Sequence, residues 1–243
     1  MPINEGDFVR VNCTGKVKDT DELFETTYEE VAIEEGLYDE NKVFKPLPVV
    51  VGGNHLLPAI EKELIGLDVG DRKTIEVAAE DAFGQRDPSL IQLVPMREFK
   101  KQGMTPVPGM KIQSEGATGK ILTVNGGRVK VDFNHELAGK DLIYDVEIDE
   151  IITDDEEKIK SMIDLHYSNP NVDVDNTEID IVDGVVNIKL DDMSKFDQQS
   201  YIDVTFARFR ISKDVWDNID GITKVNFIDE FEKKDESAEE DEE

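Results

Sequence analysis

The chain has 243 residues, of which 38% are hydrophobic, and it carries a formal net charge of −29 at pH 7. A charge of this size is repelled by the phosphates of bare nucleic acid and by anionic lipid surfaces, so we expect neither nucleic acid nor membrane as a partner. The length and the modest apolar content favour two or three compact modules over one thick core.

Three segments alternate apolar and polar residues with the period of a half-buried strand: "GDFVRVNCTGKV", "RKTIEVAAE" and "DLIYDVEIDEII". Before the second segment, a short helix is predicted with Pro58 at its first position and Gly66 as its stop. Its apolar stripe consists of Leu57, Ile60 and Leu64. Residues 1–86 and 134–152 are therefore expected to form one discontinuous α+β domain, a twisted antiparallel sheet crossed by a short helix.

The composition changes between about residues 87 and 133, where prolines and glycines precede further alternating segments. Asn125-Gly126 is a hairpin-turn signal within this stretch. Because the stretch has apolar residues of its own, we expect a small β domain inserted between two strands of the first domain, rather than a long loop.

The chain after residue 152 predicts a second α+β domain. "TDDEEKIKSMIDLHYSNP" indicates a helix that begins at Thr153 with acidic residues in its first turn. "TEIDIVDGVVNIKL" indicates a hairpin and "KVNFIDEF" a closing strand. "SYIDVTFARFRISKDVWDNI" is compatible with a helix or a strand, and we favour the helix. Residues 153–230 would form this domain, and residues 231–243 a charged, disordered tail.

The reactive side chains form no conventional catalytic set. A nucleophilic Cys13 would need a neighbouring base, and its place on the apolar face of a strand favours a small buried hydrophobe. His55, His135 and His166 lack metal-ligand spacing, so we expect no metal site and no cofactor.

Cysteine content and the amino terminus bear on the compartment. One cysteine excludes an internal disulfide framework and is typical of a reducing environment. No stretch approaches 18 consecutive apolar residues, and "MPINEGDFVR" does not resemble a signal peptide, so we expect a soluble cytoplasmic protein. The acidity suits solubility, a basic partner or a salty cytosol, and the sequence does not rank these three.

Five motifs, in this order, resemble the FKBP-type peptidyl-prolyl isomerases: "NCTGKV", "LFETT", "VVVGGNHLLPAIEKELIGLDVGD", "EVAAEDAFGQRD" and "NHELAGKDLIYDVEI". The insert and its exit "NHELAG" resemble the SlyD branch, which carries an insert-in-flap domain. The region after residue 152 is similar to the long-chain archaeal members in length and arrangement only. The resemblance implies an FKBP-like fold and peptidyl-prolyl cis–trans isomerase activity on folding proteins.

The resemblance also implies which residues line an isomerase pocket. Phe24 matches an aromatic wall, and Glu25 stands where an aspartate is usual. Leu56 and Leu57 match an apolar pair, of which the second would bind the substrate carbonyl through its backbone N–H. Further positions, where the family often has other aromatic residues, are Cys13, Leu47, Ile60, Phe83 and Tyr144. The implied pocket is apolar but less aromatic than usual, which leaves macrolide sensitivity open. On periodicity alone, several of these residues also suit an ordinary core.

A pocket of this kind explains why no reactive group is needed. Amide resonance opposes rotation about an X–Pro bond with a barrier of about 18–20 kcal/mol. The twisted transition state loses conjugation and is less polar than the planar amide. A dry apolar pocket therefore favours the transition state over the ground state, which is catalysis by differential binding.

The insert resembles a chaperone module that holds unfolded, proline-containing polypeptides near the pocket. Its expected client-binding residues are Ile91, Val94, Met96, Phe99, Met104, Val107 and Met110. The alternative is that these residues belong to ordinary loops and bind no client. A non-catalytic holdase is the alternative function; a metal-handling role is disfavoured because the tail "KKDESAEEDEE" lacks His and Cys. For the C-terminal domain we favour homodimerisation over a second client surface or a structural cap.

Overall fold

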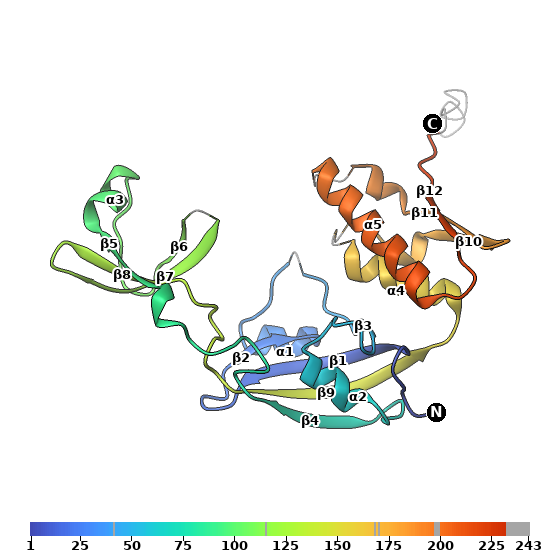
Figure 1. Ribbon diagram of the computed structural model, residues 1–243, viewed down its shortest axis with the longest axis horizontal. Coiled ribbons are helices and arrows are strands. Elements are labelled where there is room, and N and C mark those ends of the chain that lie inside the picture. Colours follow the sequence, from blue (N-terminus) through green and yellow to red (C-terminus); the bar gives the residue numbers. More distant parts are fainter. Residues whose placement is uncertain (41, 115, 168, 170, 197–199, 232–243) are drawn as a thin grey trace, which may run out of the picture.

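The computed structural model describes residues 1–231, apart from 41, 115, 168, 170 and 197–199. The expected tail falls almost wholly outside the described residues. In Figure 1 the sheet of the first domain lies in the middle, with the insert (green) at one end and the C-terminal domain (orange) at the other. The chain reaches the insert from β4 and leaves it into β9, and the C-terminal domain follows β9 directly.

The first domain is built on a five-stranded antiparallel sheet of order β2-β1-β9-β4, with β3 also paired to β1. The strands are β1 (Phe8–Val17), β2 (Leu23–Thr26), β3 (Leu47–Val50), β4 (Arg72–Val77) and β9 (Leu142–Ile152). The burial follows the alternation in the sequence: Leu142, Tyr144, Val146 and Ile148 are all buried on one face of the sheet. The expected strands are confirmed.

Helix α2 (Pro58–Leu64) packs on this apolar face and has Pro58 at its first position, as the sequence predicts. It buries Ile60 and Leu64 in the core of the first domain. A second helix, α1 (Glu29–Glu34), was not expected. It is a six-residue helix with no side-chain cap at Tyr28 and only Ala32 buried, so it lacks the apolar stripe by which a helix is recognised.

The insert is a separate four-stranded antiparallel sheet of order β5-β8-β7-β6. Its elements are the 3-10 turn η1 (Pro88–Leu90), β5 (Ile91–Pro95), α3 (Met96–Lys101), β6 (Lys111–Ser114), β7 (Ala117–Asn125) and β8 (Arg128–Asp132). Phe99, Ile112, Ile121, Val129 and Val131 form a core of its own. The hairpin turn lies one residue later than expected: β7 runs through Asn125, and Gly126 and Gly127, both at positive φ, make the turn.

The C-terminal domain places two helices against a three-stranded sheet of order β10-β11-β12. Its elements are α4 (Asp155–His166), the 3-10 turn η2 (Val174–Asn176), β10 (Glu178–Val182), β11 (Val185–Lys189), the 3-10 turn η3 (Asp192–Phe196), α5 (Tyr201–Asn218) and β12 (Lys224–Phe227). The hairpin, the helical state of α5 and the closing strand are confirmed. The predicted cap of α4 is wrong by one residue. Asp154, not Thr153, accepts the Glu156 and Glu157 N–H groups at 3.0 and 3.1 Å.

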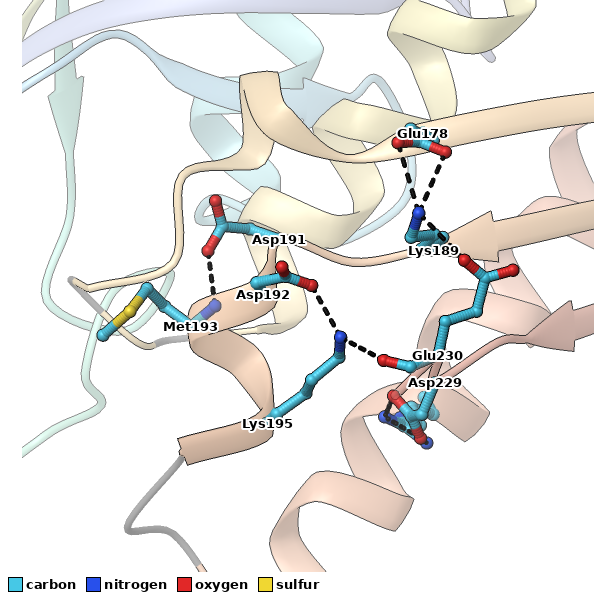
Figure 2. A network of polar contacts seen from close by, with 9 residues as sticks. Glu178, Lys189, Asp191, Asp192, Met193, Lys195, Asp229 and Glu230 are labelled. Atoms are coloured by element: carbon cyan, nitrogen blue, oxygen red, sulfur yellow. Dashed lines mark hydrogen bonds and ion pairs between the residues drawn. The ribbon is translucent and has the colours of Figure 1, made fainter. Parts of the chain in front are cut away.

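Ion pairs fix the segment that follows β12 (Figure 2). Lys189 of β11 lies between the carboxylates of Glu178 and Glu230, at 3.4 and 3.1 Å. The Lys195 ammonium joins Asp192 to the backbone carbonyl of Glu230. Arg208 of α5 donates hydrogen bonds to the Asp229 carboxylate from both terminal nitrogens. The end of the described chain is thus held to β11, η3 and α5.

The first and C-terminal domains share an apolar core. Phe8, Val50 and Ile152 of the sheet belong to the same buried cluster as Ile159 and Ile163 of α4. Polar contacts border this cluster: Lys45 Nζ lies 2.5 Å from Asp164, and Arg10 lies 3.9 Å from Glu157. A continuous core of this kind fixes the two domains relative to each other.

Within the described residues, no helix combines the length and apolar character needed to span a lipid bilayer.

Candidate functional site

Two aromatic rings and one glycine form the centre of the site. The rings of Phe24 (β2) and Tyr144 (β9) meet edge to face, with centroids 5.7 Å apart and planes at 81°. Both rings lie over Gly15 of β1, where a Cβ atom would come within 2.7 Å of the Phe24 ring and 3.0 Å of the Tyr144 ring. Glycine at this position therefore allows the two rings to pack on the sheet. The sequence pattern does not predict this role of Gly15.

The remaining expected pocket residues differ in depth. Cys13, Ile60 and Tyr144 are buried in the core of the first domain, at the depth expected of a pocket floor. Phe24, Leu56 and Leu57 are partly buried and pack against the same core, where they can form a wall. Leu47 and Phe83 are about as exposed as a rim requires, at 39% and 36%.

Glu25 lies close enough to Tyr144 and Cys13 to shift the pKa of both side chains. Burial raises the pKa of Tyr144, and a hydrogen bond to the Glu25 carboxylate raises it further. Burial also raises the pKa of the Cys13 thiol to about 12; Glu25 adds to this shift and Lys42 opposes it. Cys13 is thus a neutral thiol at pH 7 and not an activated nucleophile. The site offers an apolar surface with a few hydrogen-bonding groups beside it.

A buried carboxylate organises the loop that leads into α2. The Glu61 side chain, only 3% of whose residue surface is exposed, accepts the backbone N–H groups of Gly52, Asn54 and Leu56 at 3.0, 3.1 and 2.8 Å. Leu57, the next residue, supplies its carbonyl to the first turn of the helix. The Leu57 N–H lies before the first turn of the helix, so no carbonyl of the helix accepts a hydrogen bond from it. The role of Glu61 was not predicted, although an acid in the first turn of a helix that follows a Gly-Gly-Asn loop is a usable signal.

Two histidines that are distant in sequence come together beside this loop. The His55 and His166 rings are 6.3 Å apart, and His166 Nε2 lies 2.5 Å from Asp214 Oδ2 of α5. These contacts join the pocket loop to the C-terminal domain. In the described part of the chain, no three His, Cys, Asp or Glu residues gather in a way that could hold a metal ion.

The insert exposes fewer of the expected client-binding side chains than the sequence suggests. Ile91, Val94, Met96, Met104 and Met110 are partly buried, and Val107 is 53% exposed. The expectation for Phe99 needs correction. Its residue surface is only 3% exposed because the ring packs into the insert core, so it supports the surface from beneath. Leu93, which was not expected, is 61% exposed on β5.

Comparisons with known proteins agree with this architecture. Residues 92–137 match the family domain described as "FKBP26, IF domain", and residues 155–232 match "FKBP26_C-terminal". A short-type peptidyl-prolyl cis-trans isomerase of Methanocaldococcus jannaschii is 35% identical over 149 residues, which cover 61% of this chain and 94% of that protein.

The SlyD proteins are further relatives. The FKBP-type peptidyl-prolyl cis-trans isomerase SlyD of Escherichia coli is 38% identical over 124 residues, covering 49% of this chain and 63% of that protein. SlyD of Vibrio cholerae is 37% identical over 125 residues, covering 49% and 61%. The chain belongs to the family of FKBP-type peptidyl-prolyl cis–trans isomerases. Its fold is FKBP-like, with an insert and a C-terminal domain.

The contact between His55 and the C-terminal domain predicts a pH dependence of stability. Burial lowers the pKa of His55, against opposing contributions from Asp214 and Glu61. The unfolded chain therefore takes up this proton more readily, and the free energy of unfolding should fall as the pH drops below about 6.5, until the folded His55 also becomes protonated. Urea denaturation of wild type and His55→Gln between pH 7.5 and 5 measures the effect.

In that experiment the carboxylates titrate in both proteins, so the difference between the two curves isolates His55. We expect His55→Gln to lose less stability on acidification than wild type. Parallel curves would show that His55 is equally easy to protonate in the folded and unfolded chains.

Proposed function

We propose that the protein accelerates proline-limited folding of client polypeptides by desolvating and twisting X–Pro bonds in the pocket of Phe24, Leu57 and Tyr144. The observation that carries the proposal is the packing of Phe24 on Tyr144 over Gly15, beside a loop whose geometry Glu61 sets. This arrangement creates an apolar surface next to a backbone N–H group. It belongs to a chain whose relatives are named peptidyl-prolyl cis-trans isomerases.

Each part of the pocket has a role in this mechanism. The buried floor of Cys13, Ile60 and Tyr144 excludes water, so the charge-separated planar amide loses solvation while the less polar twisted form does not. The Leu57 N–H binds a substrate carbonyl and fixes the chain on one side of the bond. Glu25, held near the Tyr144 hydroxyl, accepts or organises hydrogen bonds at the mouth. No covalent intermediate is required.

A protease-coupled assay with a short proline peptide tests the isomerase pocket. The double variant Glu25→Ala/Phe83→Ala removes the hydrogen-bonding carboxylate and an apolar part of the rim. We expect it to lower kcat/KM at least tenfold, which corresponds to about 1.4 kcal/mol of transition-state stabilisation. The matched control is Glu156→Ala/Phe231→Ala, because both side chains are exposed in the C-terminal domain.

The same assay decides between the enzyme and a non-catalytic holdase. A wild type that fails to turn over the peptide yet suppresses aggregation of an unfolded protein would support the holdase. Unchanged turnover in Glu25→Ala/Phe83→Ala would remove these residues from the site.

The insert is proposed as the client-binding domain. In the order β5-β8-β7-β6, the outer strands β5 and β6 each have one neighbour, so an extended segment can add to either edge. Leu93 and Val107 supply exposed apolar surface. A client held there keeps its prolyl bonds close to the pocket, and tethering of this type gives effective concentrations of the order of millimolar.

Surface substitutions in the insert should separate holding from catalysis. Leu93→Ser/Val107→Ser should leave turnover of the short peptide within twofold, because neither residue belongs to the pocket. The same variant should slow catalysed refolding of a proline-limited protein severalfold, because fewer clients are held. The control is Ile33→Ser, a comparably exposed side chain on α1. Equal losses in the two assays would argue against this division of labour.

The C-terminal domain is proposed to form a homodimer through α5. Ile202, Phe206, Phe209 and Trp216 are all exposed and follow one another at spacings of four, three and seven residues. This places them along one stripe of the helix, opposite the buried stripe of Ala207, Ile211 and Val215. An exposed apolar stripe marks an interaction site, and we assign it to pairing with a second copy. A second client-binding surface is the alternative.

Light scattering tests the dimer directly. We expect wild type at about twice the chain mass of 27.4 kDa and Phe206→Asp/Phe209→Asp near one chain. Both side chains are exposed, so the substitutions should not disturb the helix. A wild-type mass of one chain at working concentration would remove the dimer and favour the client-binding alternative.

A cytoplasmic location is part of the proposal. Its support is the cysteine content, since one free, buried cysteine suits a reducing compartment.

A further inference from the structure

Two linkers connect the first domain to the insert, and they run side by side. The incoming linker comprises residues 84–90, which include the 3-10 turn η1 at the start of the insert, and the outgoing linker comprises residues 133–140. Their backbones meet at both ends: Gly139 N donates to Gly84 O at 2.8 Å, and Phe133 N donates to Leu90 O at 3.0 Å. The base of the insert is therefore a short two-stranded strap and not a pair of free connections.

Polar side chains close the strap. Asn134 accepts the Asp87 N–H at 2.8 Å and donates back to the Asp87 carbonyl at 3.0 Å. It also donates to the buried Asp132 carboxylate, which forms an ion pair with Arg86 of the incoming linker. The position of the outgoing linker is thus set by the insert strand β8, to which Asp132 belongs.

The residue after Asn134 reaches the rim of the isomerase pocket. The His135 ring stacks on the Phe83 ring with centroids 4.1 Å apart and planes 8° from parallel. The ring cannot turn freely, because its Nδ1 accepts the Leu137 N–H at 3.2 Å, and Leu137 is buried in the core of the first domain. His135 is therefore fixed by its own linker and in turn covers one face of Phe83.

The same linker faces a hollow of about 750 Å³. Asn134, His135 and Glu136 line it from the linker, and Lys111, Gly119 and Lys120 line it from β6 and β7 of the insert. A polypeptide segment bound in this hollow would contact the linker that carries His135.

We infer that His135 is a positioning residue for isomerisation: it holds the Phe83 ring at the pocket rim and makes that rim depend on the placement of the outgoing linker. This inference rests on the proposed function. The proposed effect of His135 depends on its stacking contact with Phe83. Phe83 is 36% exposed and the His135 ring covers one face of its ring, so loss of His135 would remove a contact that restrains the Phe83 rotamer. An apolar rim that moves away admits water to the twisting amide.

Two substitutions of the histidine separate stacking from hydrogen bonding. His135→Asn keeps a side-chain acceptor for the Leu137 N–H but removes the ring. His135→Phe keeps the ring and removes the acceptor. With the short proline peptide, we expect His135→Asn to lower kcat three- to tenfold with little change in KM, because desolvation acts on the transition state. His135→Phe should recover most of the lost turnover.

A double-mutant cycle with Phe83→Ala tests the route of the effect. If His135 acts through Phe83, His135→Asn should change kcat less than twofold on the Phe83→Ala background. A merely structural role would lower kcat by the same factor on both backgrounds and would not be rescued by His135→Phe. Either of those results overturns the inference.

The experiment also distinguishes this inference from the proposed function. If the wild type does not turn over the peptide, the isomerase proposal itself fails. If the wild type is active and His135→Asn matches it, only the role of His135 fails. Urea denaturation of all variants checks that the comparisons are made between folded proteins.

Discussion

The antiparallel pairing of β1 with β9 is the contact on which the other parts of the molecule depend. It joins Phe8–Val17 to Leu142–Ile152, segments separated by about half of the chain, and places Gly15 opposite Tyr144. Without this pairing, Tyr144 has no glycine to pack on and Phe24 has no ring to meet. The insert ends where β9 begins and the C-terminal domain begins where β9 ends, so one strand sets the position of all three domains.

The position of the insert lowers the entropic cost of pairing β9 with the other strands of the sheet. The insert lies between β4 and β9, which are themselves neighbours in the sheet, so its two linkers leave and return at adjacent points. Hydrogen bonds between the two linkers keep them side by side beyond the end of the sheet, as far as the insert. A long insertion costs little more than a short one under these conditions, since closure entropy grows only with the logarithm of loop length.

The sequence predicts the elements whose pattern is local. Alternation in β1 and β9, Pro58 at the start of α2 and the hairpin at Asp183-Gly184 all follow from neighbours in the chain. Helix α5 was ambiguous because Ile202, Phe206 and Phe209 fit a helical period while Ile202, Val204 and Phe206 fit the period of a strand. The buried stripe of Ala207, Ile211 and Val215 belongs to the helix. The FKBP-like fold with an insert and a C-terminal domain is confirmed, and the expected domain boundaries stay a prediction.

What the sequence does not predict depends on contacts between distant segments. The stack of Phe83 on His135 and the approach of His55 to His166 join residues whose spacing carries no periodic signal. Burial of Phe99 likewise depends on the fold of the insert, since a methionine-rich segment does not show which ring turns inward. The assignment of Cys13, Leu47 and the other pocket residues to the site stays a prediction. It is supported for Cys13, Ile60, Leu56 and Leu57, which belong to the same apolar cluster as Phe24 and Tyr144.

The division of the apolar clusters has a consequence for how the molecule comes apart. Phe8, Val50 and Ile152 tie the first domain to α4, so these two bodies should melt as one cooperative unit. The cluster around Phe99 and Ile121 contains only residues of the insert, which makes the insert a second unit that can open alone. Breathing of the insert would then expose its strands to passing chains while the ring pair of Phe24 and Tyr144 stays intact, so client capture need not compromise the rigidity on which twisting of the amide depends.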